Sequence, residues 1–241
     1  MSFKKIPLIN CDLGEGVENE EEIYPLIDSA SIACGGHIGD EHSIRDSMIL
    51  AKKNQVNIGA HPSYPDRVNF GRKSLEIEWD ELEKSLQQQL DLFLTVAQTL
   101  KVEIHHIKCH GALYNDAAKS TTLADQLTSL FMNKIPEIPI FVPFKSEMEK
   151  MVKKKGLPHY IEVFGDRAYD ENYHLVSRAE PNSLFQDFQS VNKHLESIIS
   201  FSQIRSINGK DLSIKADTLC FHGDNPGLFD FLPDIRKKFW I

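Results

Sequence analysis

The stretch EIHHIKCHGALYND, residues 103–116, contains a strand that runs directly into a helix, and units of this kind decide the fold. Residues 103–107 combine isoleucines with polar interruptions, which is typical of a strand in a sheet. ALYNDAAK (112–119) has the composition of a helix. The side chains between the two elements are a cation, a thiol and an imidazole, Lys108, Cys109 and His110.

Six further apolar runs occur along the chain, and helical patterns fill the intervals between them. The runs are IPLINC (6–11), ASIACG (30–35), VNIGAH (56–61), IPIFVPF (138–144), YIEVFG (160–165) and DTLCFHG (217–223). Apolar residues recur every three or four positions over 40–54, 78–100 and 183–204, which predicts amphipathic helices there. Strands alternating with helices indicate an α/β fold with a parallel sheet, closed as a barrel or open. No Ser/Gly linker divides residues 1–241, so we expect a single domain.

Polar and ionisable side chains follow six of the seven runs. They are Asn10, Asp12 and Glu15 at the first, His37 and Asp40 at the second, His61, Asp66 and Arg72 at the third, Lys108 and His110 at the fourth, Glu162, Asp166 and Arg167 at the sixth, and His222 and Asp224 at the last. The carboxyl ends of parallel strands lie on one face, where α/β proteins build their sites. We therefore expect these side chains around one shared pocket.

Histidines are prominent among these side chains. His61, His110 and His222 each follow a predicted strand and precede Gly or Pro, and histidine both moves protons near neutral pH and binds metals. Asp12, His37 and His61 could hold a divalent cation such as Mg²⁺, Mn²⁺ or Zn²⁺. Otherwise the same groups form an acid/base pair, in which Asp12 orients or activates a water molecule.

Cations at the strand ends predict an anionic ligand. Lys108, Arg72 and Arg167 are candidates to bind a carboxylate or a phosphate. Surface ion pairing is the ordinary alternative for a basic side chain. Lys108 fits that alternative least, because it interrupts an apolar strand where a solvated lysine has no obvious reason to be.

Composition excludes several classes of protein. The chain has 241 residues, of which 41% are hydrophobic and 26% charged, as in ordinary globular proteins. A net charge of −8 argues against a nucleic-acid partner, and no apolar run approaches the ~20 residues of a membrane helix. The four cysteines lack CxxC spacing, so we expect small buried thiols, with a cysteine nucleophile as the minor alternative. Reduced thiols and a start without a signal-like apolar stretch predict a cytoplasmic protein.

Eight motifs, in order along the chain, resemble those of the LamB/YcsF family. They are NCDLGEG (10–16), ACGGHIGD (33–40), IGAHPSYPD (58–66), FGRK (70–73), HGALYN (110–115), FGDRAYD (164–170), LVSR (175–178) and CFHGDNP (220–226). The resemblance implies a seven-stranded, distorted TIM-like (β/α) barrel, related to that of polysaccharide deacetylases. Since the characterised bacterial members of the family are the A subunit of 5-oxoprolinase, it also implies ATP-dependent opening of the lactam 5-oxo-L-proline (pyroglutamate) to L-glutamate. ADP and phosphate are the other products, and family members act with two further subunits, B and C.

Such a reaction indicates a role for each candidate residue. Phosphorylation of the lactam carbonyl oxygen would create a better electrophile, and it needs cations around the phosphate and a base that activates water. The expected binding groups are Lys108 and Arg72 for the phosphate and Arg167 for the substrate carboxylate, with Asn10, Glu15 and Asp224 completing the site. The expected catalytic groups are Asp12 with His61 or His110 as base and orienting group, and His222 as donor to the oxyanion or the ring nitrogen.

Two other functions stay open from the residues alone. One is a stand-alone, metal-dependent amide hydrolase of the deacetylase type, which needs no ATP. The other is a non-catalytic binding subunit, although a passive subunit has no need to desolvate so many charges. No P-loop or GxGxxG motif is present, so a partner subunit could hold part of the nucleotide. Four loop positions, Gly36, Cys109, Asn172 and Asn182, differ from the residues that family members commonly carry, and they bear on substrate fit.

Overall fold

A closed barrel of seven parallel strands forms the centre of the protein, in a computed structural model that describes residues 6–240. The strands are β1 (Leu8–Leu13), β2 (Ser29–Ala33), β3 (Asn57–His61), β4 (Ile104–Ile107), β5 (Ile140–Pro143), β6 (His159–Phe164) and β9 (Thr218–His222). They follow one another in chain order, and β9 pairs with both β6 and β1, which closes the barrel. The predicted α/β class and the seven-stranded parallel barrel are therefore confirmed.

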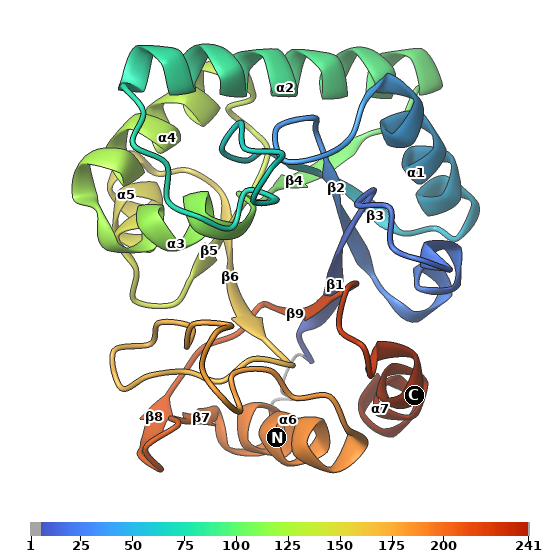
Figure 1. Cartoon of the computed structure of the whole chain (residues 1–241), viewed down its shortest axis with the longest axis vertical. Helices are drawn as coiled ribbons and strands as arrows, with labels where there is room; N and C mark the ends of the chain where they lie inside the picture. Colours follow the sequence, from blue (N-terminus) through green and yellow to red (C-terminus); the bar gives the residue numbers. More distant parts are fainter. Residues whose placement is uncertain (1–5, 241) are drawn as a thin grey trace.

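Helices cover the outside of the strands, and the long helix α2 crosses the top of the view in Figure 1. They are α1 (Glu41–Lys53), α2 (Trp79–Leu100), α3 (Gly111–Lys119), α4 (Thr121–Lys134), α5 (Glu147–Lys155), α6 (Phe188–Phe201) and α7 (Leu228–Trp240), with the 3₁₀ turns η1 (Glu20–Glu22) and η2 (Tyr24–Leu26). The helices predicted over 40–54, 78–100 and 183–204 are confirmed as α1, α2 and α6. The last begins later than its pattern because Asp187 caps it, accepting a hydrogen bond from the Ser190 amide.

A small hairpin interrupts the alternation of strands and helices. β7 (Gln203–Arg205) and β8 (Asp211–Ser213) pair antiparallel and lie beside α6 (Figure 1). The sequence analysis missed this hairpin, because strands of three residues are too short to show an alternating pattern. Within residues 6–240, no helix combines the length and the apolar character that crossing a bilayer requires.

The alternation of side chains along β1 separates the two layers of the core. Ile9, Cys11 and Leu13 belong to the hydrophobic cluster that fills the space between strands and helices. Asn10 and Asp12 alternate with them, and both contact the Lys108 ammonium inside the barrel. The barrel interior is therefore polar at its carboxyl end, which is where the candidate site lies.

Candidate functional site

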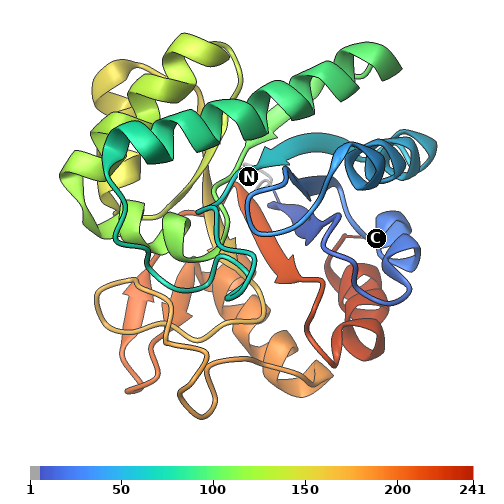
Figure 2. The ribbon, with the colours of Figure 1, turned by 45° about the horizontal axis from the view of Figure 1, so that its top comes forward.

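A cavity of about 460 Å³ opens at the carboxyl end of the barrel. The connections that follow β3 and β6 lie on this side and contribute Arg72, Ser74 and Arg178 to its wall (Figure 2). The sequence-predicted residues that line it are Asp12, Glu15, Arg72, Lys108, His110, Arg167, His222 and Asp224. The strand ends thus gather most of the predicted residues around one space. Asn10, His37 and His61 lie behind this wall and do not line the cavity.

The Lys108 ammonium lies at the centre of a buried polar group inside the barrel. Its Nζ atom is 2.8 Å from Asp12 Oδ1 and 3.0 Å from Glu162 Oε1, and it also contacts Asn10 Oδ1 and Cys220 Sγ. Burial lowers the pKa of Lys108, but the charges around it dominate and raise the pKa well above its usual value. The lysine is therefore a permanent cation that neutralises carboxylates from β1 and β6.

This geometry does not support Lys108 as a phosphate clamp. Only about 1% of the residue is exposed, and its donors face protein acceptors. The Asn10 side chain also has a partner within the protein, since its Nδ2 donates to Thr218 Oγ1 at 2.7 Å. The expectation that Asn10 contacts the substrate or a phosphate is also not supported, because its side chain is fully buried between strands β1 and β9.

Three histidines surround the carboxylate of Glu15. Its Oε1 atom lies 2.9 Å from His37 Nε2, 3.2 Å from His110 Nδ1 and 3.9 Å from His61 Nε2. The rings of His37 and His110 are stacked, with centroids 3.7 Å apart. Burial tends to raise the pKa of Glu15, but its contacts with His110 and His37 lower it. Glu15 is thus an ionised, buried anchor for the histidines.

Asp12 connects this histidine cluster to the Lys108 group. Its Oδ2 atom is 3.4 Å from His61 Nε2, while its Oδ1 atom faces Lys108. Although burial raises the pKa of Asp12, His61 and Lys108 together hold it well below its usual range. Burial also lowers the pKa of His37 to about 4 and lowers that of His110. Near neutral pH, His37 and His110 are therefore neutral and face carboxylates.

Two overlapping groups of these residues could hold a metal ion. Among the described residues they are Asp12 with His61 and His110, and Glu15 with His37 and His110. The predicted trio of Asp12, His37 and His61 does not form one of these groups, because His37 turns toward Glu15. His110, predicted as catalytic, belongs to both groups, and sequence reasoning had not placed it among metal ligands.

A second carboxylate–imidazole pair lies on the other side of the cavity. His222 Nδ1 donates to Asp166 Oδ1 at 2.9 Å, and the other oxygen of Asp166 accepts from the His222 amide and from Asn225 Nδ2. Burial raises the pKa of Asp166, but His222 and Asn225 more than offset this and lower it. Because Asp166 fixes the proton on Nδ1, the Nε2 atom of a neutral His222 is a lone pair available as a base.

Arginines give the rim of the cavity a positive charge. Arg72 and Arg178 both bind Asp224, with N–O distances of 2.5 Å and 3.0 Å. Arg167 is buried and donates to the backbone carbonyls of Ser183 and Val176, and no acidic partner of this side chain occurs among the described ion pairs. Burial and the charge of Arg178 lower its pKa, as expected for a guanidinium without a counterion. The carboxylate of Asp224 thus pairs with two guanidinium groups, while the guanidinium group of Arg167 lies nearby in the cavity wall without a described acidic partner.

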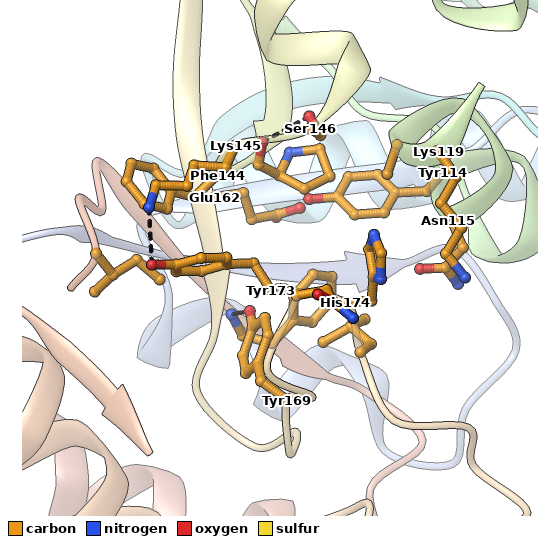
Figure 3. A pocket seen from close by; sticks show the side chains of 16 residues that line it. Tyr114, Asn115, Lys119, Phe144, Lys145, Ser146, Glu162, Tyr169, Tyr173 and His174 are labelled. Atoms are coloured by element: carbon orange, nitrogen blue, oxygen red, sulfur yellow. Dashed lines mark hydrogen bonds between the residues drawn. The ribbon is translucent and has the colours of Figure 1, made fainter. Parts of the chain in front are cut away.

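A second, much smaller cavity of about 30 Å³ adjoins the first, with Tyr114 and Phe164 in both walls. Figure 3 shows the Tyr114 hydroxyl directed toward the Glu162 carboxylate, and Lys145 bonded to the Tyr173 hydroxyl at 2.9 Å. Its volume is that of about one water molecule. It is therefore an extension of the site and too small to hold a separate ligand.

Arg178 on the rim is a functional candidate that the sequence analysis did not name, although it stands in the motif LVSR (175–178). Asp166 and Glu162 were expected at the end of the sixth run, but without a role. The structure places Asp166 behind His222 and Glu162 beside Lys108. The sequence could not assign these roles, because a single carboxylate near an apolar strand pattern does not reveal its partner.

The four departures from common family residues lie in different surroundings. Gly36 does not line the large cavity, and a Cβ atom there would lie 2.3 Å from Ser63 Oγ. Asn172 lines the small cavity and Cys109 lines the large one, whereas Asn182 lines neither. All four cysteines are free and buried, as predicted, and burial raises the pKa of Cys109 to about 12. A cysteine nucleophile therefore has no support.

Comparisons with known proteins agree with this fold and with its motifs. The 5-oxoprolinase A subunit of Campylobacter jejuni (strain 81-176) is 38% identical over 235 residues, which cover 95% of this chain and 92% of that protein. The protein of the same name from Pyrococcus abyssi is 34% identical over 234 residues, with the same coverage of 95% and 92%. The lactam utilization protein of Thermus thermophilus superposes with a TM-score of 0.87 at 28% identity, and 97% of each chain is covered.

The match is not limited to a single motif. The model of the LamB/YcsF family matches residues 8–240, which include all seven barrel strands and the whole candidate site. The chain therefore belongs to the LamB/YcsF family.

Proposed function

We propose that this chain is the A subunit of an ATP-dependent 5-oxoprolinase, a hydrolase that opens the lactam of 5-oxo-L-proline to give L-glutamate, ADP and phosphate. Its relatives are named as the A subunit of 5-oxoprolinase and as a lactam utilization protein, which supports a lactam as the substrate. The observation that carries the proposal is the cavity of about 460 Å³, which combines guanidinium groups at its rim with carboxylate–imidazole groups on its floor.

The charge of the cavity suits the substrate and the phosphate. 5-Oxoproline carries one carboxylate next to its ring amide, and phosphorylation adds further negative charge. Arg167 is the best candidate to bind the substrate carboxylate, because it lines the cavity and its guanidinium group donates to backbone carbonyls and not to a carboxylate among the described ion pairs. Arg72 and Arg178, held together by Asp224, are the better candidates for the phosphate, in place of Lys108.

His222 is the best placed proton carrier in the cavity. Its ring lines the cavity, and Asp166 orients it through Nδ1. It can accept a proton from the attacking water and then donate it to the ring nitrogen that leaves. Asp12 and His110 line the same cavity, whereas His61 is buried behind them and would act only through its contact with Asp12 or His110.

ATP enters this proposal as the co-substrate. Phosphoryl transfer normally takes place with Mg²⁺ or Mn²⁺ bound to the nucleotide, so a divalent cation accompanies it. A cavity of about 460 Å³ is small for substrate and ATP together, which supports a site completed by the B and C subunits.

The decisive measurement is ADP release that depends on 5-oxoproline, by this chain alone and in the presence of B and C subunits. We expect turnover with the partners, together with L-glutamate formation in equal amount. Release of ADP without glutamate, or no 5-oxoproline dependence in the reconstituted mixture, would contradict the proposal.

Two variants connect the activity to the cavity. Arg167→Gln should raise KM for 5-oxoproline more than it lowers kcat, because it removes a cation that binds the ground state as well as the transition state. His222→Gln should instead lower kcat, by about 10²–10⁴-fold for a lost general base. Arg205→Gln is the matched control, because Arg205 is exposed on the hairpin and does not line the cavity.

A second candidate function is a stand-alone, metal-dependent amide hydrolase. The two overlapping groups of buried carboxylates and histidines favour it. Glutamate formation by this chain without ATP, abolished by a chelator and restored by a metal, would select this function. A strict requirement for ATP would reject it.

A further inference from the structure

Three consecutive residues after strand β3 contact the stacked histidines of the cavity wall. His61 Nε2 lies 3.0 Å from His110 Nδ1, and the Pro62 carbonyl accepts from the His110 amide at 2.8 Å. Ser63 Oγ lies 2.9 Å from His37 Nδ1. Because the rings of His37 and His110 are themselves stacked, the position of this segment decides where both imidazoles lie.

A glutamine of helix α2, outside the barrel, holds this segment. Gln89 Oε1 accepts from the Ser63 amide at 3.0 Å, and Gln89 Nε2 donates to the Ser63 carbonyl at 3.0 Å. Nε2 also donates to Ser85 Oγ at 3.1 Å, within the same helix. No backbone partner of the Ser63 amide or carbonyl occurs among the described hydrogen bonds, so the side chain of Gln89 takes the place of a neighbouring strand.

The Ser63 hydroxyl belongs to a series that ends at the cavity. Ser63 Oγ contacts His37 Nδ1, and His37 Nε2 contacts Glu15 Oε1, each at 2.9 Å. A serine, an imidazole and a carboxylate in series are typical of a nucleophilic triad, but such a serine has to reach the substrate. Ser63 is fully buried and does not line the large cavity, so the series transmits position and does not supply a nucleophile.

Gly36 leaves the space in which this series passes. A Cβ atom there would lie 2.3 Å from Ser63 Oγ and 2.6 Å from Gln89 Oε1. Gly36 does not have a positive φ, so space and not backbone conformation is the constraint at this position. A side chain here would separate Ser63 from His37 or from Gln89.

We propose that Gln89 is a positioning residue of the cavity. Through Ser63 it fixes His37, and His37 in turn orients Glu15 and His110, which line the cavity. The contact between Ser63 and His37 does not depend on which of them carries the proton, since a hydroxyl group both donates and accepts. The use of Glu15 and His110 in lactam opening rests on the proposed function, whereas the link from Gln89 to His37 does not.

The ring nitrogens of His37 report on this link directly. They are observed by NMR in the ¹⁵N-labelled full chain without substrate, and His37→Gln assigns them. Gln89→Met removes both hydrogen bonds to Ser63 at a similar side-chain length, so the Nδ1 resonance of His37 should move, as it should in Ser63→Ala. Gln88→Met is the matched control, because Gln88 is an exposed glutamine in the same helix, and it should leave the resonance in place.

Circular dichroism checks the fold of each variant. If Gln89→Met did not fold, Gly36→Ala would test the same link from another element, because its Cβ atom displaces Ser63 Oγ. An unchanged His37 resonance in the folded variant would overturn the proposal.

Turnover of 5-oxoproline in the presence of the B and C subunits tests the consequence for the cavity. Gln89→Met should lower kcat about 10–100-fold and change KM less, because it misplaces groups of the cavity without touching the substrate. The double variant with Ser63→Ala should lose less than the product of the two single losses, since both act through His37.

The outcomes separate this inference from the proposed function. A less stable Gln89→Met with unchanged kcat would show a purely structural role and overturn the inference. Absence of turnover by the wild type would contradict the proposed function, and the His37 resonance would still decide whether Gln89 positions this histidine.

Discussion

Lys108 illustrates how the role of one residue depends on its partners. In the sequence it is a cation at a strand end, suited to a phosphate. In the structure its ammonium is fully buried between Asp12 and Glu162. Removing one partner of a buried ion pair leaves an uncompensated charge, which costs far more than losing a surface pair. The residue therefore stabilises the barrel interior in its folded state.

Lys108→Met tests this role through stability. The variant leaves two buried carboxylates without their cation, so the free energy of unfolding should fall by about 3–5 kcal/mol. Adding Glu162→Gln should restore part of the loss, because it removes one of the stranded charges. Urea denaturation measures both effects, with Lys150→Met on the exposed face of α5 as the control. If Lys108→Met had the same free energy of unfolding as the wild type, the ammonium would not stabilise the interior.

Asp166 should make stability depend on acid pH. Its pKa is lowered in the folded protein, so its contribution is present above its ordinary pKa of about 3.9 and disappears as pH falls through the folded value. Asp166→Asn should lower the free energy of unfolding by about 1–3 kcal/mol near neutral pH, since three hydrogen bonds lose a charged acceptor. Melting temperatures measured down to about pH 2 should show this difference from the wild type shrinking as pH falls. A constant difference would reject the assigned pKa direction.

At the scale of elements, the turn between β4 and α3 positions one wall of the site. Gly111 begins α3 with φ of +53°, a conformation that side chains with a Cβ atom rarely adopt. The next residue, Ala112, donates its amide to the Gly71 carbonyl at 2.9 Å. This links the turn to the β3–α2 connection, whose Phe70 carbonyl accepts from His110. The two connections therefore hold His110 together.

Gly111→Ala should lower the free energy of unfolding by more than the left-handed backbone conformation of this residue alone would explain. A Cβ atom at this position would lie 2.6 Å from the Gly71 carbonyl oxygen, which forces the two connections apart. Left-handed backbone geometry costs about 1–2 kcal/mol, and the contact should add about 1–3 kcal/mol. Gly156→Ala is the matched control, because Gly156 has φ of +67° and nothing within 4 Å of its Cβ position. If urea denaturation gave equal losses of the free energy of unfolding for Gly111→Ala and Gly156→Ala, the contact with the Gly71 carbonyl would not contribute.

At the scale of the whole molecule, the closure of the barrel depends on elements from the two ends of the chain. β9 pairs with β1, so Asp12 and His222 lie in register although they are far apart in sequence. Helix α7 covers this seam, and its Phe231 ring lies 5.9 Å from the ring of Phe221 on β9. The cavity is therefore complete only when the last strand and helix have docked.

Phe231→Ala should destabilise the whole fold. The side chain is fully buried against β9, and deleting a buried phenyl group typically costs about 3–5 kcal/mol. Phe229→Ala changes the same residue type in the same helix at a side chain that is 36% exposed, so its effect should be much smaller. Urea denaturation followed by far-ultraviolet circular dichroism compares them. Equal effects would mean that α7 does not stabilise the closure.

The amino-acid sequence by itself determined the elements and the end of the fold that carries chemistry. Apolar periodicity located all seven barrel strands and three of the helices, because burial on one face imposes a pattern that is local in the chain. Asp12, Lys108, His110 and His222 come at the ends of predicted parallel strands, and the carboxyl ends of such strands lie on one face. The sequence therefore also predicted that these side chains share that face.

Only the tertiary structure decided which of these groups contact one another. That Lys108 pairs with Glu162, that His37 turns to Glu15 and that His110 joins His61 are outcomes of barrel closure and loop packing. Each pair joins residues from different strands or loops, so no local pattern encodes the contact. The protons and charges of the site follow from these contacts, and for that reason the metal ligands predicted from the sequence, Asp12 with His37 and His61, differ from the groups that the folded chain forms.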